Sequence, residues 1–130
     1  MKFAYKAVRI HTNGKLTSIL ANISSPCCVE YKRGQIARPY GGKFFVYSQK
    51  PTRKQLERVS TDANIRVFKC VVDDLVKALN IPKGWSGNVN DTWFQFWAGA
   101  LNPSDTQTPL EDTYFCNEVM LLNDVTRSIK

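Results

Sequence analysis

Six stretches of this sequence have the composition and the alternation of β-strands, and this pattern restricts the possible folds more than any other feature. The first stretch, KFAYKAVRI, alternates aromatic or small residues with Lys and Arg. Turn-forming Gly, Pro and Asn residues separate the stretches, which cover residues 2–10, 16–23, 27–32, 43–48, 64–72 and 113–125. We therefore expect an α+β protein with a mostly antiparallel sheet of about five or six strands.

The turns and the apolar patterns indicate how these strands are arranged. Asn13 and Gly14 are a favoured pair for a type I′ hairpin turn, which predicts that the first two strands pair with each other. Residues 43–48 and residues 113–125 are apolar on both faces of the expected strands. Both strands are therefore expected to lie in the centre of the sheet.

Two short helices are expected on one face of the sheet. Thr52 and Gln55 follow Pro51 in a capping-box pattern, in which each side chain satisfies a free backbone N–H, and the helix should run to about residue 60. Asp73 or Asp74 can cap a second helix, because apolar residues follow at helical spacing. The residues of this second apolar stripe are Val72, Leu75, Val76 and Leu79.

Length and composition are those of one globular domain. The chain has 130 residues, of which 43% are hydrophobic and 22% are charged, which suffices for one apolar core but not for two domains. No stretch approaches the ~18 apolar residues of a membrane span, and the N-terminus carries charges where a signal peptide is apolar. We expect a single domain over residues 1–130, cytoplasmic and not bound to a membrane.

From residue 83 to residue 111 the chain is irregular in composition but rich in aromatic residues. Gly, Asn, Pro, Ser and Thr are frequent there, yet the segment also contains Trp85, Trp93 and Trp97. Disordered segments contain few aromatic residues. The segment is therefore interpreted either as an ordered lid packed on the core or as an adhesive surface for a ligand or a partner subunit.

The charges are unevenly distributed along the chain, whose formal net charge is +7. Between Lys32 and Lys69 there are ten basic residues and two acidic ones, whereas between Asp91 and Asp124 there are six acidic residues and no basic one. If the basic segment forms one face, its field attracts polyanions or small phosphorylated ligands. The alternative is a solvated basic surface that keeps the protein soluble.

The stretch ARPYGGKFFVY looks like a phosphate-binding loop, but its context differs. A Walker A loop places Ser or Thr after its lysine, whereas Phe44 follows Lys43. Such loops also lead into a helix, whereas Gly41 and Gly42 lead into a strand. Two interpretations remain: the glycines turn the chain tightly into the strand, or backbone N–H groups flanked by Arg38 and Lys43 form an anion nest.

Catalytic, metal and cofactor chemistry are not expected. The four cysteines form no C-x-x-C pair and His11 is the single histidine, so neither a metal site nor a Cys–His nucleophile is favoured. Glu118 is the one acid in an otherwise apolar stretch. It either points outward or pairs with an arginine, or else it is a polar group at the floor of a pocket.

The order of several segments resembles short uncharacterised proteins of bacteriophages and prophages. These segments are YKAVR, VEYKRGQ, FFVYS with a helix after it, VFKCVV and TYFCNEVMLL, and together they span most of the chain. Some small phage proteins bind host nucleotide signals and so counter host defence. The resemblance implies a nucleotide-sequestering protein of the host cytoplasm, without a catalytic signature.

The leading hypothesis is a binding module, without cofactor, for a nucleotide or another phosphorylated ligand. Arginine and lysine neutralise phosphate, and aromatic rings stack on a base. The candidate ligand-binding residues are Arg33, Arg38, Tyr40, Lys43, Arg53, Trp85 and Trp93. A homo-oligomer that holds the nucleotide between subunits is one form that this hypothesis allows.

Three alternatives stay open. A single-stranded nucleic acid would bind in a basic groove rather than in a pocket. A protein-binding inhibitor or a structural subunit of a phage would use its exposed tryptophans as the centre of an interface. An enzyme, such as a degenerate nucleotide transferase with Glu118 as its acid, ranks last because no nucleophile, base and orienting group can be named together.

Overall fold

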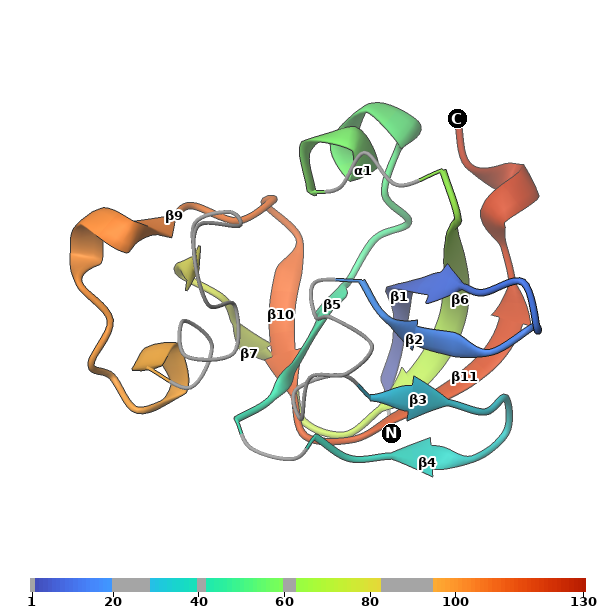
Figure 1. Ribbon diagram of the computed structural model, residues 1–130, viewed down its shortest axis with the longest axis horizontal. Helices are drawn as coiled ribbons and strands as arrows, with labels where there is room; N and C mark the ends of the chain where they lie inside the picture. Colours follow the sequence, from blue (N-terminus) through green and yellow to red (C-terminus); the bar gives the residue numbers. More distant parts are fainter. Residues whose placement is uncertain (1, 20–28, 40–41, 60–62, 83–94) are drawn as a thin grey trace.

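The computed structural model of the protein describes residues 2–19, 29–39, 42–59, 63–82 and 95–130 (Figure 1). The strands in this part of the chain are β1 (Lys2–Ile10), β2 (Leu16–Ser18), β3 (Glu30–Tyr31), β4 (Ile36–Ala37), β5 (Phe44–Tyr47), β6 (Ile65–Val72), β7 (Val76–Lys77), β8 (Ile81–Pro82), β9 (Thr106–Gln107), β10 (Thr113–Cys116) and β11 (Val119–Asp124). The helical elements are α1 (Arg53–Val59), a turn at residues 95–97, and the 3-10 helices η1 (Pro103–Asp105) and η2 (Thr126–Ser128).

Nine of these strands form one antiparallel sheet. Its order is β4-β11-β6-β1-β5-β10-β7, with β2 beside β1 and β3 beside β2, while β8 and β9 form a separate two-stranded sheet. The mostly antiparallel α+β architecture with little helix is thereby confirmed. The number of strands exceeds the expectation because four two-residue strands, β4, β7, β8 and β9, lie outside the expected stretches and because the last expected strand is divided into β10 and β11. A strand of two residues is too short for an alternating pattern to be recognised.

The central strand of the main sheet is β1. It pairs with β6 over eight consecutive residues, and its other edge pairs with β2 and β5. The sheet curls, so that its inward face encloses a core shared by β1, β5, β6 and β11, in which Val8, Val46 and Leu121 are buried. A second core lies on the outer face of the sheet, where Ala7 and Val67 pack with α1 and the C-terminal residues.

The first helix is built as expected. The Thr52 backbone N–H donates a hydrogen bond to Gln55 Oε1 at 2.9 Å, and the Gln55 N–H donates to Thr52 Oγ1 at 3.1 Å. This reciprocal pair is the capping box, and it satisfies two N–H groups that have no partner inside the helix. The predicted helix is thereby confirmed.

The first hairpin forms, but its turn is not of type I′. Gly14 has φ +84° and no non-glycine residue in the described ranges has a positive φ, so Asn13 does not adopt the left-handed conformation that a type I′ turn requires. Instead, the Gly14 N–H donates to the His11 carbonyl oxygen and the His11 N–H donates to the Lys15 carbonyl oxygen. These bonds belong to a three-residue loop with Gly14 as its single left-handed residue.

The prediction of a second helix after Asp73 is wrong. The chain forms β7 there, and Val76 pairs with Phe115 of β10. Leu79 is 81% exposed and Val76 is 50% exposed, whereas Val72 is buried in the main core and Leu75 packs against it. The four residues of the expected apolar stripe therefore do not pack on the core together. The backbone hydrogen bonds of the strand pair replace those of a short helix, whose nucleation is unfavourable.

The last predicted strand is two strands in different parts of the sheet. β10 ends at Cys116 and pairs with β5, whereas β11 begins at Val119 and pairs with β6. The chain turns at Asn117 and Glu118, the two polar residues of this stretch. Both strands have neighbours on two sides, so the expected central position holds for each of them.

Within the described ranges, no helix has the length and apolarity that a membrane-spanning helix needs.

Candidate functional site

The two arginines expected to bind phosphate near β4 lie at opposite ends of β11. Arg33 Nε donates a hydrogen bond to the Leu122 carbonyl oxygen at 2.8 Å, and its guanidinium carbon lies 5.8 Å from the centre of the Phe68 ring. Arg38 is instead at the other end, where its Nε and Nη2 both lie 3.0 Å from Glu118 Oε1. Four residues of extended strand separate these positions by about 13 Å.

The Arg38–Glu118 contact agrees with one of the two interpretations of Glu118. The carboxylate pairs with an arginine, and both side chains are more than a third exposed, at 38% for Glu118 and 67% for Arg38. An exposed pair of this kind contributes little to stability, about 0–1 kcal/mol. Arg38 is therefore not a free cation.

The other candidate residues are placed as follows. Lys43 is half-buried before β5, close enough for its charge to act on the Cys116 thiol, and Arg53 is exposed at the start of α1, where its N–H donates to the Lys130 carbonyl oxygen. Lys43, Arg53 and Arg33 are not among the residues that line the hollow described below. Tyr40, Trp85 and Trp93 lie outside the described residues.

Part of the aromatic segment packs on the sheet. The Trp97 ring lies 5.0 Å from the Phe115 ring of β10 and 4.9 Å from the Phe96 ring, measured between centres. Gly42 has φ +69°, and a Cβ at this position would collide with the Trp97 indole. Gly42 therefore provides both the turn into β5 and the space for the indole.

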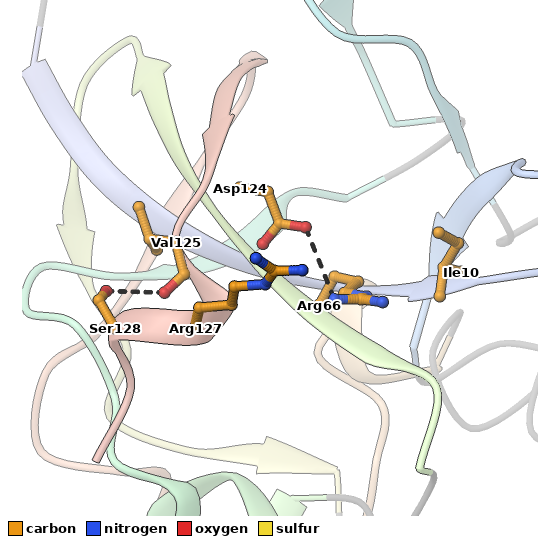
Figure 2. A pocket seen from close by; sticks show the side chains of 6 residues that line it. All are labelled: Ile10, Arg66, Asp124, Val125, Arg127 and Ser128. Atoms are coloured by element: carbon orange, nitrogen blue, oxygen red, sulfur yellow. Dashed lines mark hydrogen bonds and ion pairs between the residues drawn. The ribbon is translucent and has the colours of Figure 1, made fainter.

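A hollow of about 490 Å³ lies where the ends of β1, β6 and β11 meet η2 (Figure 2). Arg66 comes from β6 and Arg127 from η2, and both side chains line the hollow. The remaining lining residues are Ile10, Asp124, Val125 and Ser128.

The charge of the hollow is positive. Asp124 is its one carboxylate, and its Oδ2 is 4.0 Å from an Arg66 guanidinium nitrogen, at the limit of an ion pair. Asp124 Oδ1 accepts a hydrogen bond from the Thr126 N–H at 2.9 Å, so one oxygen of this carboxylate already caps η2. Lys50 Nζ donates to Ser128 Oγ at 2.8 Å and adds a third cation at the edge of the hollow.

Lys6 of β1 is a buried amine in the main core. Its side chain is 4% exposed, its Nζ donates to the Phe45 carbonyl oxygen at 2.8 Å, and the same nitrogen lies 4.4 Å from the centre of the Phe45 ring. Burial lowers the pKa of Lys6 from 10.5 to about 8. The alternation of the sequence did not reveal that Lys6 is buried. It groups Lys6 with the polar residues of the strand, whereas the structure places Lys6 inward, between the core residues Ala4 and Val8.

The cysteines of the described ranges are not activated nucleophiles. Burial raises the pKa of the Cys70 and Cys116 thiols to about 12, so both stay protonated near neutral pH. Among the residues that the structure describes, no three His, Cys, Asp or Glu side chains are grouped as metal ligands.

Comparison of the chain with protein-family models, with curated proteins and with solved structures finds no match.

Sequence reasoning missed the set of residues that lines the hollow. Lys50 and Arg66 belong to the basic segment, but nothing in their spacing distinguishes them from the other basic residues. Arg127 lies outside that segment, near the C-terminus. The excess of basic residues was the only sign of this site in the sequence. The individual residues could not be predicted, because their side chains come from three segments that lie far apart in the chain.

Proposed function

We propose that the protein is a non-catalytic binding protein that sequesters a phosphorylated ligand of the nucleotide class in the hollow between β6 and η2. One observation carries the proposal: two guanidinium groups from separate elements, Arg66 and Arg127, line the same hollow, and a single carboxylate faces them. A guanidinium group offers a planar pair of N–H donors that matches two phosphate oxygens.

Size and chemistry of the hollow support a small ligand. Its volume of about 490 Å³ lies within the range of about 300–1,000 Å³ that is typical of small-molecule sites. Lys50 adds positive charge beside Ser128, and Ile10 and Val125 provide apolar surface for a base or a sugar. Arg33, from the turn between β3 and β4, donates a hydrogen bond to the Leu122 carbonyl oxygen of β11 and lies over the Phe68 ring, and can add to the attraction of an anion.

The proposal keeps the ligand class that was expected from the sequence, but it places the binding site elsewhere on the molecule. Of the earlier candidates, Arg33 lies at the same end of β11 as the hollow, whereas Arg38 lies at the other end in an ion pair with Glu118. The sequestration of a host nucleotide signal by a phage protein remains the biological role that we propose on the basis of the resemblance.

A thermal-shift experiment with nucleotides tests the proposal. Cyclic, mono- and diphosphate nucleotides, inorganic phosphate and a single-stranded oligonucleotide are added to the protein, and the melting temperature is recorded. A ligand at a hundred times its Kd stabilises the folded state by about 2.7 kcal/mol. We expect a rise in melting temperature with at least one nucleotide, and loss of this rise in Arg66→Ala and Arg127→Ala.

Matched variants distinguish the hollow from general basic charge. Lys54→Ala removes an exposed cation from α1, and Arg38→Ala removes one at the far end of β11. Both should keep the nucleotide-induced shift. If the shift is lost in Arg38→Ala but not in Arg127→Ala, the hollow is not the site. If no nucleotide changes the melting temperature while the oligonucleotide binds with a steep salt dependence, the protein binds nucleic acid instead.

A further inference from the structure

Four apolar side chains form a row across four neighbouring strands. Phe3 of β1 pairs with Val71 of β6, Val71 with Met120 of β11, and Met120 with Ile36 of β4. Residues that face each other directly on antiparallel strands lie on the same face of the sheet, with Cβ atoms about 4.5–5.5 Å apart. The four side chains, named here the apolar row, therefore lie in line over about 14 Å.

The apolar row points away from the main core. The next row of register partners, Ala4, Cys70 and Leu121, is buried in that core, and successive residues of a strand point to opposite faces. The two ends of the apolar row are exposed, Phe3 at 63% and Ile36 at 54%, while Val71 and Met120 between them are half-buried.

Among the described residues, the second core covers the other half of the outer face of the sheet. Ala7 and Val67 of β1 and β6 pack there with Leu56 of α1 and with Ile129. The apolar row lies further along the same two strands, and none of its four residues belongs to that second core. An exposed line of apolar side chains on a sheet is characteristic of an interaction surface.

Charges of opposite sign lie on the two sides of the apolar row. Lys69 precedes Val71 by two residues on the same face, and its Nζ lies 4.6 Å from the centre of the Phe3 ring. On the other side lie the Asp73 and Glu118 carboxylates, and the Glu118 backbone N–H donates a hydrogen bond to Asp73 Oδ1 at 3.0 Å. Arg38 neutralises one of these two carboxylates, so that side keeps a net negative charge.

We propose that a second copy of this chain packs against the apolar row and forms a two-fold symmetric dimer, sheet against sheet. A two-fold axis parallel to the row places the Lys69 side of each copy over the Asp73 and Glu118 side of the other. The surface is therefore apolar along the row, and the charges on its two sides are complementary between the two copies. The side chains that face the main core take no part in this interface, so the folded protein forms the dimer without rearrangement.

The size of the row sets the expected strength. A standard interface buries about 800 Å² on each partner, and four side chains are the centre of such an interface rather than all of it. The net charge of +7 on each copy also opposes association. We therefore expect a reversible dimer whose population rises with protein concentration and with moderate salt, which screens the overall repulsion.

Sedimentation equilibrium over a wide range of protein concentration tests the dimer. The double variant Phe3→Ser with Ile36→Ser should weaken association by at least about tenfold. Leu79→Ser is the matched control, because Leu79 is 81% exposed but lies beside β7, at the opposite end of the sheet order from β4. This control should associate like the unchanged protein, and circular dichroism should show that all variants are folded.

A charge exchange identifies the second copy as the occupant. Lys69→Glu and Glu118→Lys each place like charges opposite each other in their own dimers, so each variant alone should be monomeric. A mixture of the two should form a heterodimer, because every Lys–Glu contact across the axis is then restored. The proposal is overturned by a protein that stays monomeric at all concentrations, by association that the Phe3 and Ile36 changes leave intact, or by a mixture that does not associate.

Discussion

At the scale of single residues, Lys6 shows how a polar side chain can occupy an inward position of a central strand. Burial disfavours its charged form and lowers the pKa of Lys6 to about 8, while the Phe45 carbonyl oxygen and the neighbouring rings retain part of the stabilisation that water would give. The charged amine therefore destabilises the fold at neutral pH. Replacement by an apolar side chain of similar length should be favourable.

We predict that Lys6→Met raises the free energy of unfolding at pH 7 by up to about 3 kcal/mol, since each pKa unit corresponds to about 1.36 kcal/mol. The pKa of Lys6 is about 8 in the folded state and 10.5 for a lysine fully exposed to water, so the unfolded chain binds more protons between these values. The contribution of Lys6 to stability therefore rises with pH in this window. Urea unfolding of the unchanged protein and of Lys6→Met at several pH values measures this contribution to the free energy of unfolding.

The difference between the two proteins isolates Lys6 from other groups. Burial raises the pKa of Cys70 and Cys116 to about 12, so these thiols lower the stability of both proteins above about pH 9. The advantage of Lys6→Met should shrink from pH 8 to pH 10.5. Lys54→Met, on the exposed side of α1, is the control for the replacement of a lysine by methionine outside the core. An advantage that does not change with pH would contradict the buried charge.

Gly42, in contrast to Lys6, is a residue whose identity the fold requires. Gly42→Ala should lower the free energy of unfolding by about 2 kcal/mol or more, because a positive φ disfavours alanine and the new Cβ collides with the Trp97 indole. Gly14→Ala is a matched control, since Gly14 has φ +84° but no atom within 4 Å of the position that a Cβ would take. Tryptophan fluorescence should change in Gly42→Ala only, and equal losses of stability in both variants would show that the indole contact is unimportant.

At the scale of elements, Asp73 joins two turns of the sheet. Its Oδ1 accepts hydrogen bonds from the Asn117 N–H at 2.9 Å and from the Glu118 N–H at 3.0 Å, and so fixes the point where β10 ends and β11 departs. Burial is the largest single influence on this carboxyl and acts to raise its pKa. The hydrogen bonds from Glu118 and Asn117 outweigh it and hold the pKa of Asp73 below its usual value.

We predict that Asp73→Ala lowers the free energy of unfolding by about 1–3 kcal/mol, because two backbone N–H groups lose their acceptor. Asp73→Asn keeps an acceptor oxygen without the charge and should lose less. The carboxylate of the unchanged protein stabilises the fold above its unfolded pKa of 3.8, and this stabilisation is lost as the pH falls through the lower folded pKa. Denaturant unfolding between about pH 6 and about pH 2 should therefore bring the unchanged protein closer to Asp73→Asn. A gap that widens on acidification would be inconsistent with this role.

The elements also differ in how much of them the sequence predicted. The Thr52–Gln55 capping box could be predicted because its partners are three residues apart, and the strand at β6 could be predicted because its pattern extends over eight residues. The helix predicted after Asp73 could not be corrected from the sequence. Its competitor is a pairing of Val76 and Lys77 with β10, whose residues lie almost forty positions further along the chain.

At the scale of the whole molecule, stability should decrease from the centre of the sheet toward the small sheet of β8 and β9. β1 and β6 share eight register pairs, whereas β8 and β9 share two. We predict that amide protons of β1 and β6 exchange with solvent only through global unfolding, and that those of β8 and β9 exchange through a local opening with a lower free energy. Hydrogen exchange followed by mass spectrometry or NMR measures both, and equal protection of the two regions would contradict this.

The sequence by itself determined the local features of this protein. The positions of the longer strands, the capping box and the pairing of the first two strands depend on residues close to each other in the chain, and the structure reproduces them. The type I′ turn and the alternation of the first strand are not reproduced, because Asn13 has a negative φ, Lys6 is buried and Phe3 is exposed. For Glu118 the sequence left open an outward position, a pair with an arginine and a place at the floor of a pocket, and the structure has the pair with Arg38.

Only the tertiary structure decided which distant residues meet. The separation of β10 from β11, the inward position of Lys6, the apolar row and the meeting of Arg66 with Arg127 all depend on strand register and on the curl of the sheet. Register is selected by the burial of whole faces at once, so a local pattern does not specify which residue of one strand lies opposite a given residue of another. For this reason the ligand class that we propose depends on composition, while the place proposed for it depends on the tertiary structure.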